Sequence, residues 1–460
     1  MQQDNGKTVK RKKRLPMSPE RVFSMGFLGI ILIGTLLLSL PIATVTRTPL
    51  SLFDALFTAT SAVCVTGLVA VDTGTTFSAF GQAVLLLLIQ VGGLGFMIFT
   101  SLLMSLLGRR ISLRGKVLLR ESMSGNSLDG LLHLTGVYSG IALGIEGIGA
   151  LLLAVRFIPV YGAGKGIWYS VFHAVSAFCN AGFDLFGHFA SLTGFRNDAW
   201  VLMVISVLII LGSIGFFVIF ELLEEHFRWK ELSLHTRLVL IASGLLLTVG
   251  TLLIALIEWN NPATLAQENS GFFSRLVNAF FQSVTMRTAG FNSVDLSAMH
   301  SGTKLICVML MFVGASPAST GGGVKTTTVF VLLGVVISVI KGRRDTVLLR
   351  KRLPDGLAKR ALAITMIYLT LVLGCTLFVS CMEGDRYALI DLLFENTSAI
   401  ATVGVSAVGT PQLCLASRAL LIPAMYLGRV GPMTLAMAFA AEMNKAEKRV
   451  RYPEENIMIG

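Results

Sequence analysis

The sequence is poor in charge for its length. Charged residues make up 14% of its 460 residues and hydrophobic residues 54%, with a mean hydropathy of +0.75. Such a chain is too apolar to be a soluble globular protein of this size. The composition indicates a polytopic membrane protein whose main surroundings are a lipid bilayer.

The sequence also lacks paired cysteines and enzyme motifs. No CxxC pair or zinc-ligand spacing is present, so neither a disulfide framework nor structural zinc is expected. No HExxH, GxSxG or paired-acid motif is found, which argues against a membrane-embedded enzyme. The six cysteines, mostly within apolar stretches, are Cys64, Cys179, Cys307, Cys375, Cys381 and Cys414.

Acidic residues are fewer than basic ones, 26 against 38, which gives a formal net charge of +12. This excess alone would suggest a nucleic-acid partner. The basic residues, however, lie between hydrophobic stretches and form no stripe on a soluble domain. They are typical of topology signals, and no nucleic-acid partner is expected.

One motif occurs four times, at 57–67, 172–182, 280–290 and 394–404. Each copy opens with Phe and reaches a Gly ten positions later. Successive glycines are 115, 108 and 114 residues apart (67 to 182, 182 to 290, 290 to 404). Such a period indicates a repeated architecture, because four packing glycines in an ordinary bundle would not explain it.

Each copy predicts a short helix followed by an extended segment that ends at the glycine. It is too short and polar to cross a bilayer, so it must be re-entrant, with its backbone packed in protein or facing water. No Asp or Glu occupies the last five residues of any copy, so backbone carbonyls rather than a carboxylate ring would bind a cation. The candidate filter residues are Val63, Cys64, Val65, Thr66, Gly67, Phe178, Cys179, Asn180, Ala181, Gly182, Thr288, Ala289, Gly290, Ala401, Thr402, Val403 and Gly404.

Eight apolar stretches long enough for transmembrane helices accompany the four copies. They predict an all-α membrane protein of four tandem M1-P-M2 repeats (outer helix, re-entrant loop, inner helix), arranged with pseudo-fourfold symmetry around a central pore. The stretches are 22–45, 81–107, 131–158, 199–223, 236–258, 304–341, 359–382 and 417–441. The expected divisions are a basic tail (1–21), repeats at 22–108, 109–227, 228–345 and 346–444, and a C-terminal segment (445–460).

The loops between repeats are basic, at 109–120, 228–237 and 341–360. By the positive-inside rule these loops and both termini are cytoplasmic, and the re-entrant segments enter from outside.

A second repeat lies 24 to 30 residues after the filter glycines, as a pair of residues three apart. The pairs are Gly92 and Gly95, Gly212 and Gly215, Gly314 and Pro317, and Gly428 and Gly431. Small residues at this spacing allow helices to approach closely. They could equally be bend points below a filter, and the sequence does not decide between the two.

The third inner helix is interrupted at 314–323 by glycine, serine and proline. Such a break at membrane depth requires a polar path, so we expect this run to form a gate beneath the filter. A Walker A loop ending at Lys325 is the alternative, but Val324 stands where that motif needs glycine, and no soluble strand precedes it. The candidate gate residues are Gly314, Ala315, Ser316, Pro317, Gly321, Gly322, Gly323, Lys325 and Arg429.

Three ionisable residues lie inside apolar segments. Arg429 stands where the other inner helices have small residues, so it should face a cavity or a partner. Glu146 is either functional or simply bonded to a neighbouring helix, and it is also a candidate partner for Arg429. Arg287 should point behind the filter toward an acid such as Asp391 or Glu395, because a guanidinium in a cation path would repel the ion.

The motifs TSAVCVTGL, AFCNAGFD, MRTAGFN, TVGVS, GGGVKTTT and LGRVGP resemble those of the Trk/Ktr/HKT superfamily of potassium transporters, over nearly the whole chain. The resemblance implies a homodimer in the bacterial cell membrane, regulated by a KtrA-like cytoplasmic ring of nucleotide-binding RCK subunits. It places the filter glycines at Gly67, Gly182, Gly290 and Gly404, the gate loop at 314–325 and a pore arginine at Arg429. Sodium-selective plant members carry serine at the first of these positions, so Gly67 points to potassium.

One departure from the pattern is visible in the third copy. Ser283 and Thr285 flank Val284 there, where the other copies place a serine, so this pore helix should contact its neighbours differently.

A secondary transporter is disfavoured because the repeats share one orientation and are not inverted. Whether sodium is cotransported or only activates, and which nucleotide a regulator senses, stay open.

Overall fold

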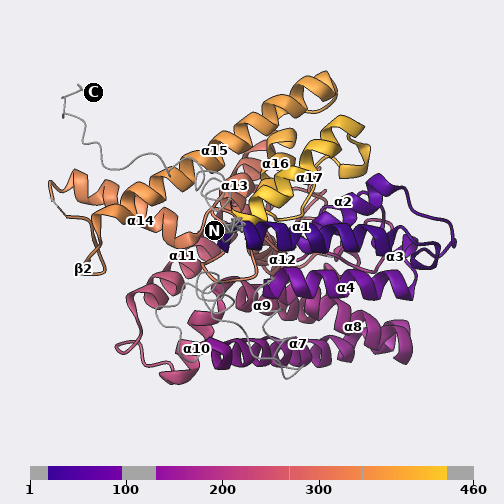
Figure 1. Ribbon diagram of the computed structural model, residues 1–460, viewed down its shortest axis with the longest axis horizontal. Helices are drawn as coiled ribbons and strands as arrows, with labels where there is room; N and C mark the ends of the chain where they lie inside the picture. Colours follow the sequence, from indigo (N-terminus) through magenta and orange to yellow (C-terminus); the bar gives the residue numbers. More distant parts are fainter. Residues whose placement is uncertain (1–18, 96–130, 269, 344, 432–460) are drawn as a thin grey trace, which may run out of the picture.

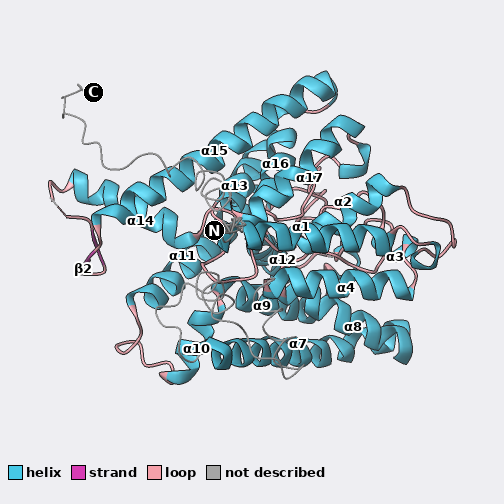
Figure 2. Cartoon of the chain, in the orientation of Figure 1, coloured by secondary structure: helices cyan, strands magenta, loops and turns pink. Residues whose placement is uncertain are grey.

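The computed structural model describes residues 19–95, 131–268, 270–343 and 345–431. The described chain is mostly helical, and its one sheet is a two-stranded antiparallel hairpin (Figure 2). The helices are α1 (Pro19–Leu38), α2 (Leu52–Val63), α3 (Thr73–Thr76), α4 (Ala79–Leu94), α7 (Leu131–Tyr161), α8 (Ala163–Phe178), α9 (Ala199–Ile214), α10 (Phe216–Glu224), α11 (Leu234–Glu258), α12 (Phe272–Thr285), α13 (Ser301–Phe312), α14 (Thr326–Ile340), α15 (Asp355–Glu383), α16 (Leu389–Ile400) and α17 (Leu415–Val430). The strands are β1 (Val347–Leu348) and β2 (Lys351–Arg352), and single 3₁₀ turns lie at Pro41–Ala43, Thr193–Phe195, Gly384–Arg386 and Thr410–Gln412.

Within the described residues, three helices are long and apolar enough to cross a membrane: α7, α11 and α15. A fourth span results if α9 and α10, bent by 94° at Gly215, count as one. Shorter apolar helices lie at α1, α2, α4, α13 and α14. A helix or a broken pair therefore occupies each of the eight stretches expected from sequence. The ends of two stretches (96–107 and 432–441), the loop at 109–120 and the tails fall outside the described residues.

The helices pack in four groups of three (Figure 1). In each group the first helix contacts both the short helix and the last helix: α1, α2 and α4; α7, α8 and α9; α11, α12 and α13; α15, α16 and α17. The last helix of each group also packs on the short helix of the next, in the pairs α4 with α8, α9 with α12, α13 with α16 and α17 with α2. Because the fourth pair returns to the first group, the contacts close into a ring.

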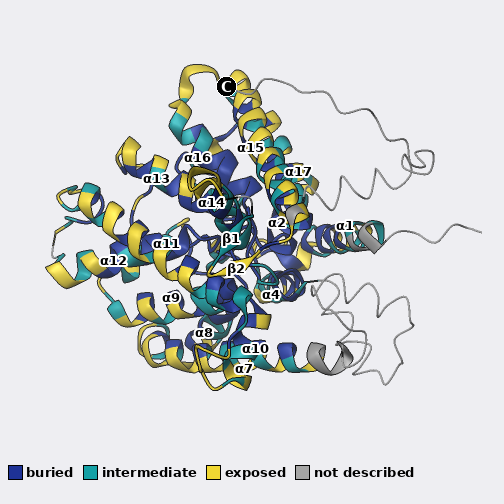
Figure 3. Ribbon diagram, turned by 90° about the vertical axis from the view of Figure 1, so that its left-hand side faces the viewer, coloured by how far each residue is buried: buried dark blue, intermediate teal, exposed yellow. Residues whose placement is uncertain are grey.

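Burial follows this arrangement, with the buried residues in the middle of the molecule and the exposed ones on its outer helices (Figure 3). The second halves of the four short helices are buried almost without exception. Outer helices expose large apolar side chains instead, such as Leu151 on α7 and Leu256 on α11, at 72% and 79%. An apolar surface of this kind is suited to lipid, because the exposure of aliphatic side chains to lipid tails carries no free-energy cost.

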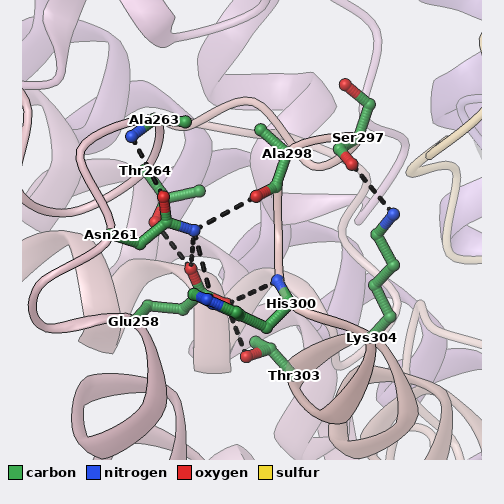
Figure 4. A network of polar contacts seen from close by, with 9 residues as sticks. All are labelled: Glu258, Asn261, Ala263, Thr264, Ser297, Ala298, His300, Thr303 and Lys304. Atoms are coloured by element: carbon green, nitrogen blue, oxygen red, sulfur yellow. Dashed lines mark hydrogen bonds and ion pairs between the residues drawn. The ribbon is translucent and has the colours of Figure 1, made fainter.

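A buried carboxylate fastens the third group at one end of α11 (Figure 4). Glu258 is fully buried and accepts hydrogen bonds from the Asn261 amide (2.6 Å), Thr264 Oγ1 (2.7 Å), the His300 backbone N–H (2.9 Å) and Thr303 Oγ1 (2.5 Å). These donors come from the loop after α11 and from the start of α13. One carboxylate thus joins the end of α11 to the start of α13, the two helices that flank α12.

Candidate functional site

The four short helices α2, α8, α12 and α16 end at the repeated motif. In three of them the last helical residue lies four positions before the motif glycine: Val63, Phe178 and Ile400. Helix α12 ends at Thr285, five positions before Gly290. The third segment therefore has one more residue, Arg287, between its helix cap and the strained backbone that follows.

Backbone strain recurs at the same two places in every segment, the glycine and the residue two before it. The φ angles are 54° and 92° at Val65 and Gly67, 58° and 70° at Asn180 and Gly182, 67° and 88° at Thr288 and Gly290, and 52° and 95° at Thr402 and Gly404. β-Branched residues rarely adopt positive φ, at a cost of roughly 1–3 kcal/mol each. Val65, Thr288 and Thr402 hold this conformation because the surroundings impose it. Strain shared by four segments marks them as a site.

The four glycines meet in a ring. A Cβ atom on Gly67 would lie 2.5 Å from the Ala181 carbonyl oxygen, one on Gly182 2.9 Å from the Ala289 oxygen, and one on Gly290 2.7 Å from the Val403 oxygen. A Cβ on Gly404 would collide with the Thr66 oxygen, which closes the circle. Each glycine thus lies against the carbonyl that precedes the next glycine. No side chain fits at these positions, and none of these four oxygens accepts a hydrogen bond from the described residues.

Hydroxyl groups on the short helices hold the segments from behind. Ser61 Oγ accepts from the Gly67 N–H and Ser398 Oγ from the Gly404 N–H, both at 3.0 Å. Ser176 Oγ donates to the Phe183 oxygen at 2.7 Å. In the third segment Thr285 Oγ1 donates to the Phe291 oxygen at 2.6 Å. In two segments the glycine N–H, and in the other two the carbonyl that follows the glycine, is thus bonded to the short helix, while the four ring carbonyls have no partner among the described residues.

The third segment differs from the others as its sequence predicts. Thr285 replaces the backing serine, and Ser283 Oγ donates instead to the Leu247 oxygen of α11 at 3.0 Å. The Ala289 N–H bonds to the Thr285 oxygen, whereas in the first segment the equivalent Thr66 N–H reaches Ser61, one position further back. The register of helix and filter is shifted by one residue in this quadrant.

The glycine pairs of the inner helices serve both packing and termination. A Cβ on Gly92, Gly212 or Gly428 would strike a carbonyl oxygen at the end of its own group's short helix. Three residues later, Gly95, Gly215 and Gly431 have φ of 80°, 104° and 89° and end α4, α9 and α17. Close packing is therefore borne out at Gly92, Gly212 and Gly428, and a bend at Gly215, where α9 and α10 meet at 94°. The residues after Gly95 and Gly431 lie outside the described part of the chain, and Gly314 and Pro317 lie in the loop between α13 and α14.

The interrupted third inner helix forms a loop between α13 and α14 directly under the ring. Val313 and Val324 pair in a parallel bridge, and the Gly314 N–H donates to the Val324 oxygen, so the loop leaves and returns at one place. At its tip, Gly321 packs on Thr288 Oγ1 and Gly322 on Thr402 Oγ1 and the Ala401 oxygen. The loop lies against the strained residues of two filter segments.

This loop is also bound to the second group. The Ser316 and Thr320 N–H groups donate to the Ser213 and Gly212 oxygens at 3.0 and 3.2 Å, and the Phe216 N–H donates to the Ala318 oxygen at 3.0 Å. Lys325 Nζ folds back on the Gly321 oxygen at 2.6 Å. The expected gate residues 314–325 are thus brought together as one hydrogen-bonded unit.

Arg429 reaches the loop from α17. Its guanidinium donates to the Thr320 oxygen, to the Gly92 oxygen and, at 3.4 Å, to the Gly93 oxygen. The side chain therefore links the fourth group to the first and to the loop of the third. An ion pair between Arg429 and Glu146 is absent: Glu146 is bonded elsewhere.

Glu146, on α7, accepts from Gln90 Nε2 of α4 through both carboxylate oxygens, at 3.0 and 3.1 Å. Cys179 Sγ of the second filter segment lies 3.7 Å from the same carboxylate. Of the two interpretations of this residue, the structure bears out a buried residue bonded to a neighbouring helix.

The prediction that Arg287 faces an acid such as Asp391 or Glu395 is wrong. Its side chain is 1% exposed and points behind the filter, but its Nη2 donates to Ser243 Oγ of α11 at 3.2 Å. Asp391 pairs with Lys304 at 2.6 Å, and Glu395 accepts from Ser406 and Thr410. Both acids are engaged by donors nearer to them, so neither is available to Arg287.

A cavity of about 590 Å³ opens on the other side of the ring. All four glycines of the ring line it, together with Asp72, Asp184 and Asp295. Burial raises the pKa of Asp184 to about 7; the Phe186 N–H opposes this and the Asp72 charge adds to it. Burial alone would raise the pKa of Asp72, but hydrogen bonds from Thr75, Phe189 and His188 outweigh the effect of burial. The pKa of Asp72 therefore lies below its ordinary value.

Two residues of this region were not predicted from sequence. Thr320 Oγ1 donates to the Phe178 oxygen at 3.1 Å and its own carbonyl binds Arg429, so it couples the loop to the second short helix. Asp184 borders the mouth of the ring. Its place two residues after a motif glycine was the available signal.

Fold and site together define a class: a helical membrane protein in which four strained backbone segments surround an axis and a loop lies beneath them. The TrkH family model, described as a cation transport protein, matches residues 18–449. The chain belongs to this family of cation transport proteins.

Individual relatives agree with this assignment. The chain is 39% identical to Ktr system potassium uptake protein B of Bacillus subtilis (strain 168), over 97% of this chain and 98% of the relative. It is 38% identical to potassium/sodium uptake protein NtpJ of Enterococcus hirae, over 98% and 99%. The crystal structure of the potassium transporter TrkH from Vibrio parahaemolyticus has the same fold, with a TM-score of 0.71 at 17% identity, covering 95% of this chain and 88% of the other.

Proposed function

We propose that this protein takes up potassium ions across the bacterial cell membrane through a pore on the axis of the four-glycine ring. The observation that carries the proposal is the ring itself: four segments with the same pair of positive φ angles, each glycine against the next segment's unpaired carbonyl. Carbonyl oxygens arranged around an axis replace the hydration shell of potassium.

The selectivity follows from what the ring offers. It presents carbonyl dipoles and no carboxylate, and the short helices direct the negative ends of their dipoles toward it, which favours a weakly hydrated cation over an anion. Potassium would be held by the carbonyls of residues 63–67, 178–182, 288–290 and 401–404. The family resemblance and Gly67 in the first segment support potassium over sodium.

The four helix groups are, in this proposal, four M1-P-M2 repeats with pseudo-fourfold symmetry, divided at 22–108, 109–227, 228–345 and 346–444. The closed ring of contacts from α2 through α17 supports it. Both termini and the loops rich in Lys and Arg lie in the cytoplasm, and the cavity above the ring opens outside. Two copies form a homodimer, as the family resemblance implies.

Gating is assigned to the loop 314–325 together with Arg429. The loop tip packs on Thr288 and Thr402 under the ring and is rich in glycine, so it is placed to obstruct the path and able to move. Arg429 adds a positive charge there and holds the loop through the Thr320 carbonyl.

A cytoplasmic partner completes the system. The basic segment around β1 and β2 offers exposed Arg350, Lys351 and Lys359 for a KtrA-like ring of nucleotide-binding RCK subunits. The Bacillus subtilis relative is named as a component of a Ktr system, which supports this. The Enterococcus hirae relative is named for potassium and sodium, so we also propose that uptake depends on sodium.

The test is uptake of labelled rubidium, a potassium analogue, into liposomes that hold the pure protein. With sodium present at a constant concentration, we expect saturable uptake that unlabelled potassium suppresses at lower concentration than additional sodium does. Gly404→Ala, which would drive a Cβ into the Thr66 carbonyl, is the inactive control. Equal suppression by the two ions, or full activity in Gly404→Ala, would contradict the proposal. Nucleotide response of the pure protein without a partner would remove the RCK ring from it.

A further inference from the structure

The outer rim of the filter is formed by the residues two positions after each glycine: Val69, Asp184, Asn292 and Ser406. All four line the cavity above the ring together with the glycines. Asp184 is the one charged member of this set. The four quadrants of the rim therefore differ in charge although their backbones correspond.

The other two carboxylates of the cavity are more heavily engaged. Asp72 accepts from the Thr75 N–H and from the Phe189 N–H, both at 3.0 Å, and from the Thr75 hydroxyl. Asp295 is exposed and accepts from the Ser297 N–H at 2.9 Å and its hydroxyl at 2.7 Å. Asp184 is half-buried and the structure records one hydrogen bond for it, from the Phe186 N–H to Oδ1 at 3.0 Å.

The charge of Asp184 is also uncompensated. No Lys, Arg or His is among the residues that line this cavity in the described part of the chain, and no ion pair of Asp184 occurs there. A fixed charge in a cleft with low-dielectric walls focuses its field along the opening. Here that opening leads to the carbonyl ring.

We propose that Asp184 is the rim carboxylate that concentrates cations at the outer mouth and thereby sets the apparent affinity for the transported ion. This inference rests on the proposed function. The residue acts before the filter, so its loss lowers the local cation concentration and leaves the passage through the ring unchanged. It should therefore alter KM for uptake and spare the maximal rate.

The variant Asp184→Asn removes the charge and keeps an oxygen that can accept from the Phe186 N–H. In rubidium uptake at external pH 8 and low ionic strength, we expect KM to rise roughly three- to tenfold with an unchanged maximal rate. Added choline chloride should shrink the difference, because salt screens a charge that borders the open cavity. Asp295→Asn is the matched control: it makes the same change of charge and keeps the same type of bond, but at an exposed residue five positions after its glycine, so KM should shift by less than twofold.

Moving the charge separates electrostatics from structure. Asn292→Asp places a carboxylate on the neighbouring quadrant of the rim; alone it should lower KM, and combined with Asp184→Asn it should restore it. Any of three results would overturn the inference. The KM of Asp184→Asn could stay within twofold of that of the unmodified protein, or Asp295→Asn could shift KM equally. The third is that Asn292→Asp leaves KM unchanged both alone and combined with Asp184→Asn. Absence of saturable rubidium uptake by the unmodified protein would instead overturn the proposed function.

Discussion

Replacement of Arg429 by alanine should increase maximal uptake. The guanidinium is held beneath the filter by three carbonyls, those of Thr320, Gly92 and Gly93. Its position opposite small residues of the other inner helices places a fixed positive charge beside the proposed ion path. The variant removes that charge and releases the loop from α17.

The magnitude follows from Coulomb's law. A unit charge 4–6 Å from a potassium ion opposes it by roughly 3–4 kcal/mol at an effective dielectric of 20. Since each 1.4 kcal/mol corresponds to a factor of ten, the charge alone could slow passage by about a hundredfold or more. The loop still lies under the ring in Arg429→Ala, so we expect a gain of at least about tenfold. Arg429→Lys should gain less, because the charge stays while the planar fork of donors is lost.

The assay is rubidium uptake per amount of folded protein in liposomes, with the thermal midpoint measured on the same preparation. A faster rate with a modest fall in thermal midpoint supports a plug that also anchors the loop. Slower uptake in Arg429→Ala together with a large loss of stability would refute the reasoning and make Arg429 a structural residue.

Three further predictions concern the ring, the loop and the outer network. Gly67→Ser, which forces a Cβ against the next segment's carbonyl at φ +92°, should raise sodium uptake relative to potassium uptake. The control Gly384→Ser, at positive φ but in open space, should not change this ratio. Unchanged ion preference of Gly67→Ser in competition uptake would remove Gly67 from the filter. Deletion within Ala315–Gly323 should increase flux if, as proposed, the loop obstructs the path; a folded deletion variant that conducts less, or no differently, would make the break merely structural. Glu258→Gln should destabilise the protein by about 1–3 kcal/mol, because an amide cannot accept hydrogen bonds from all of the buried donors. Thermal unfolding in detergent measures the loss of stability, with the exposed Glu268→Gln as control, and equal midpoints of the two variants would contradict the prediction.

The sequence predicts the four segments well because their constraint is local. A glycine that tolerates positive φ must recur wherever the same backbone is built, so the period of the motif survives although most other positions vary. The glycine pairs and the glycine-rich loop were visible for the same reason: close backbone approach leaves no room for a side chain. Helix–helix contacts that close the ring could only be inferred from the number of copies.

Side-chain partners were harder to predict. Phe and Gly are ten residues apart in every copy, so nothing in the spacing reveals that α12 ends one residue early and that Arg287 is the additional residue. Arg287 faces Ser243, far away in sequence, because Asp391 and Glu395 are taken by Lys304, Ser406 and Thr410. Competition among donors is decided by tertiary packing, which a single sequence does not record.

The central claim is that the four strained segments bind potassium through their carbonyls, and locating the ion tests it most directly. Crystals of the protein grown in rubidium should show anomalous scattering on the axis between Thr66, Ala181, Ala289 and Val403. Replacing rubidium by sodium should remove the density. Rubidium sites elsewhere in the membrane-spanning region, with none on this axis, would contradict the account.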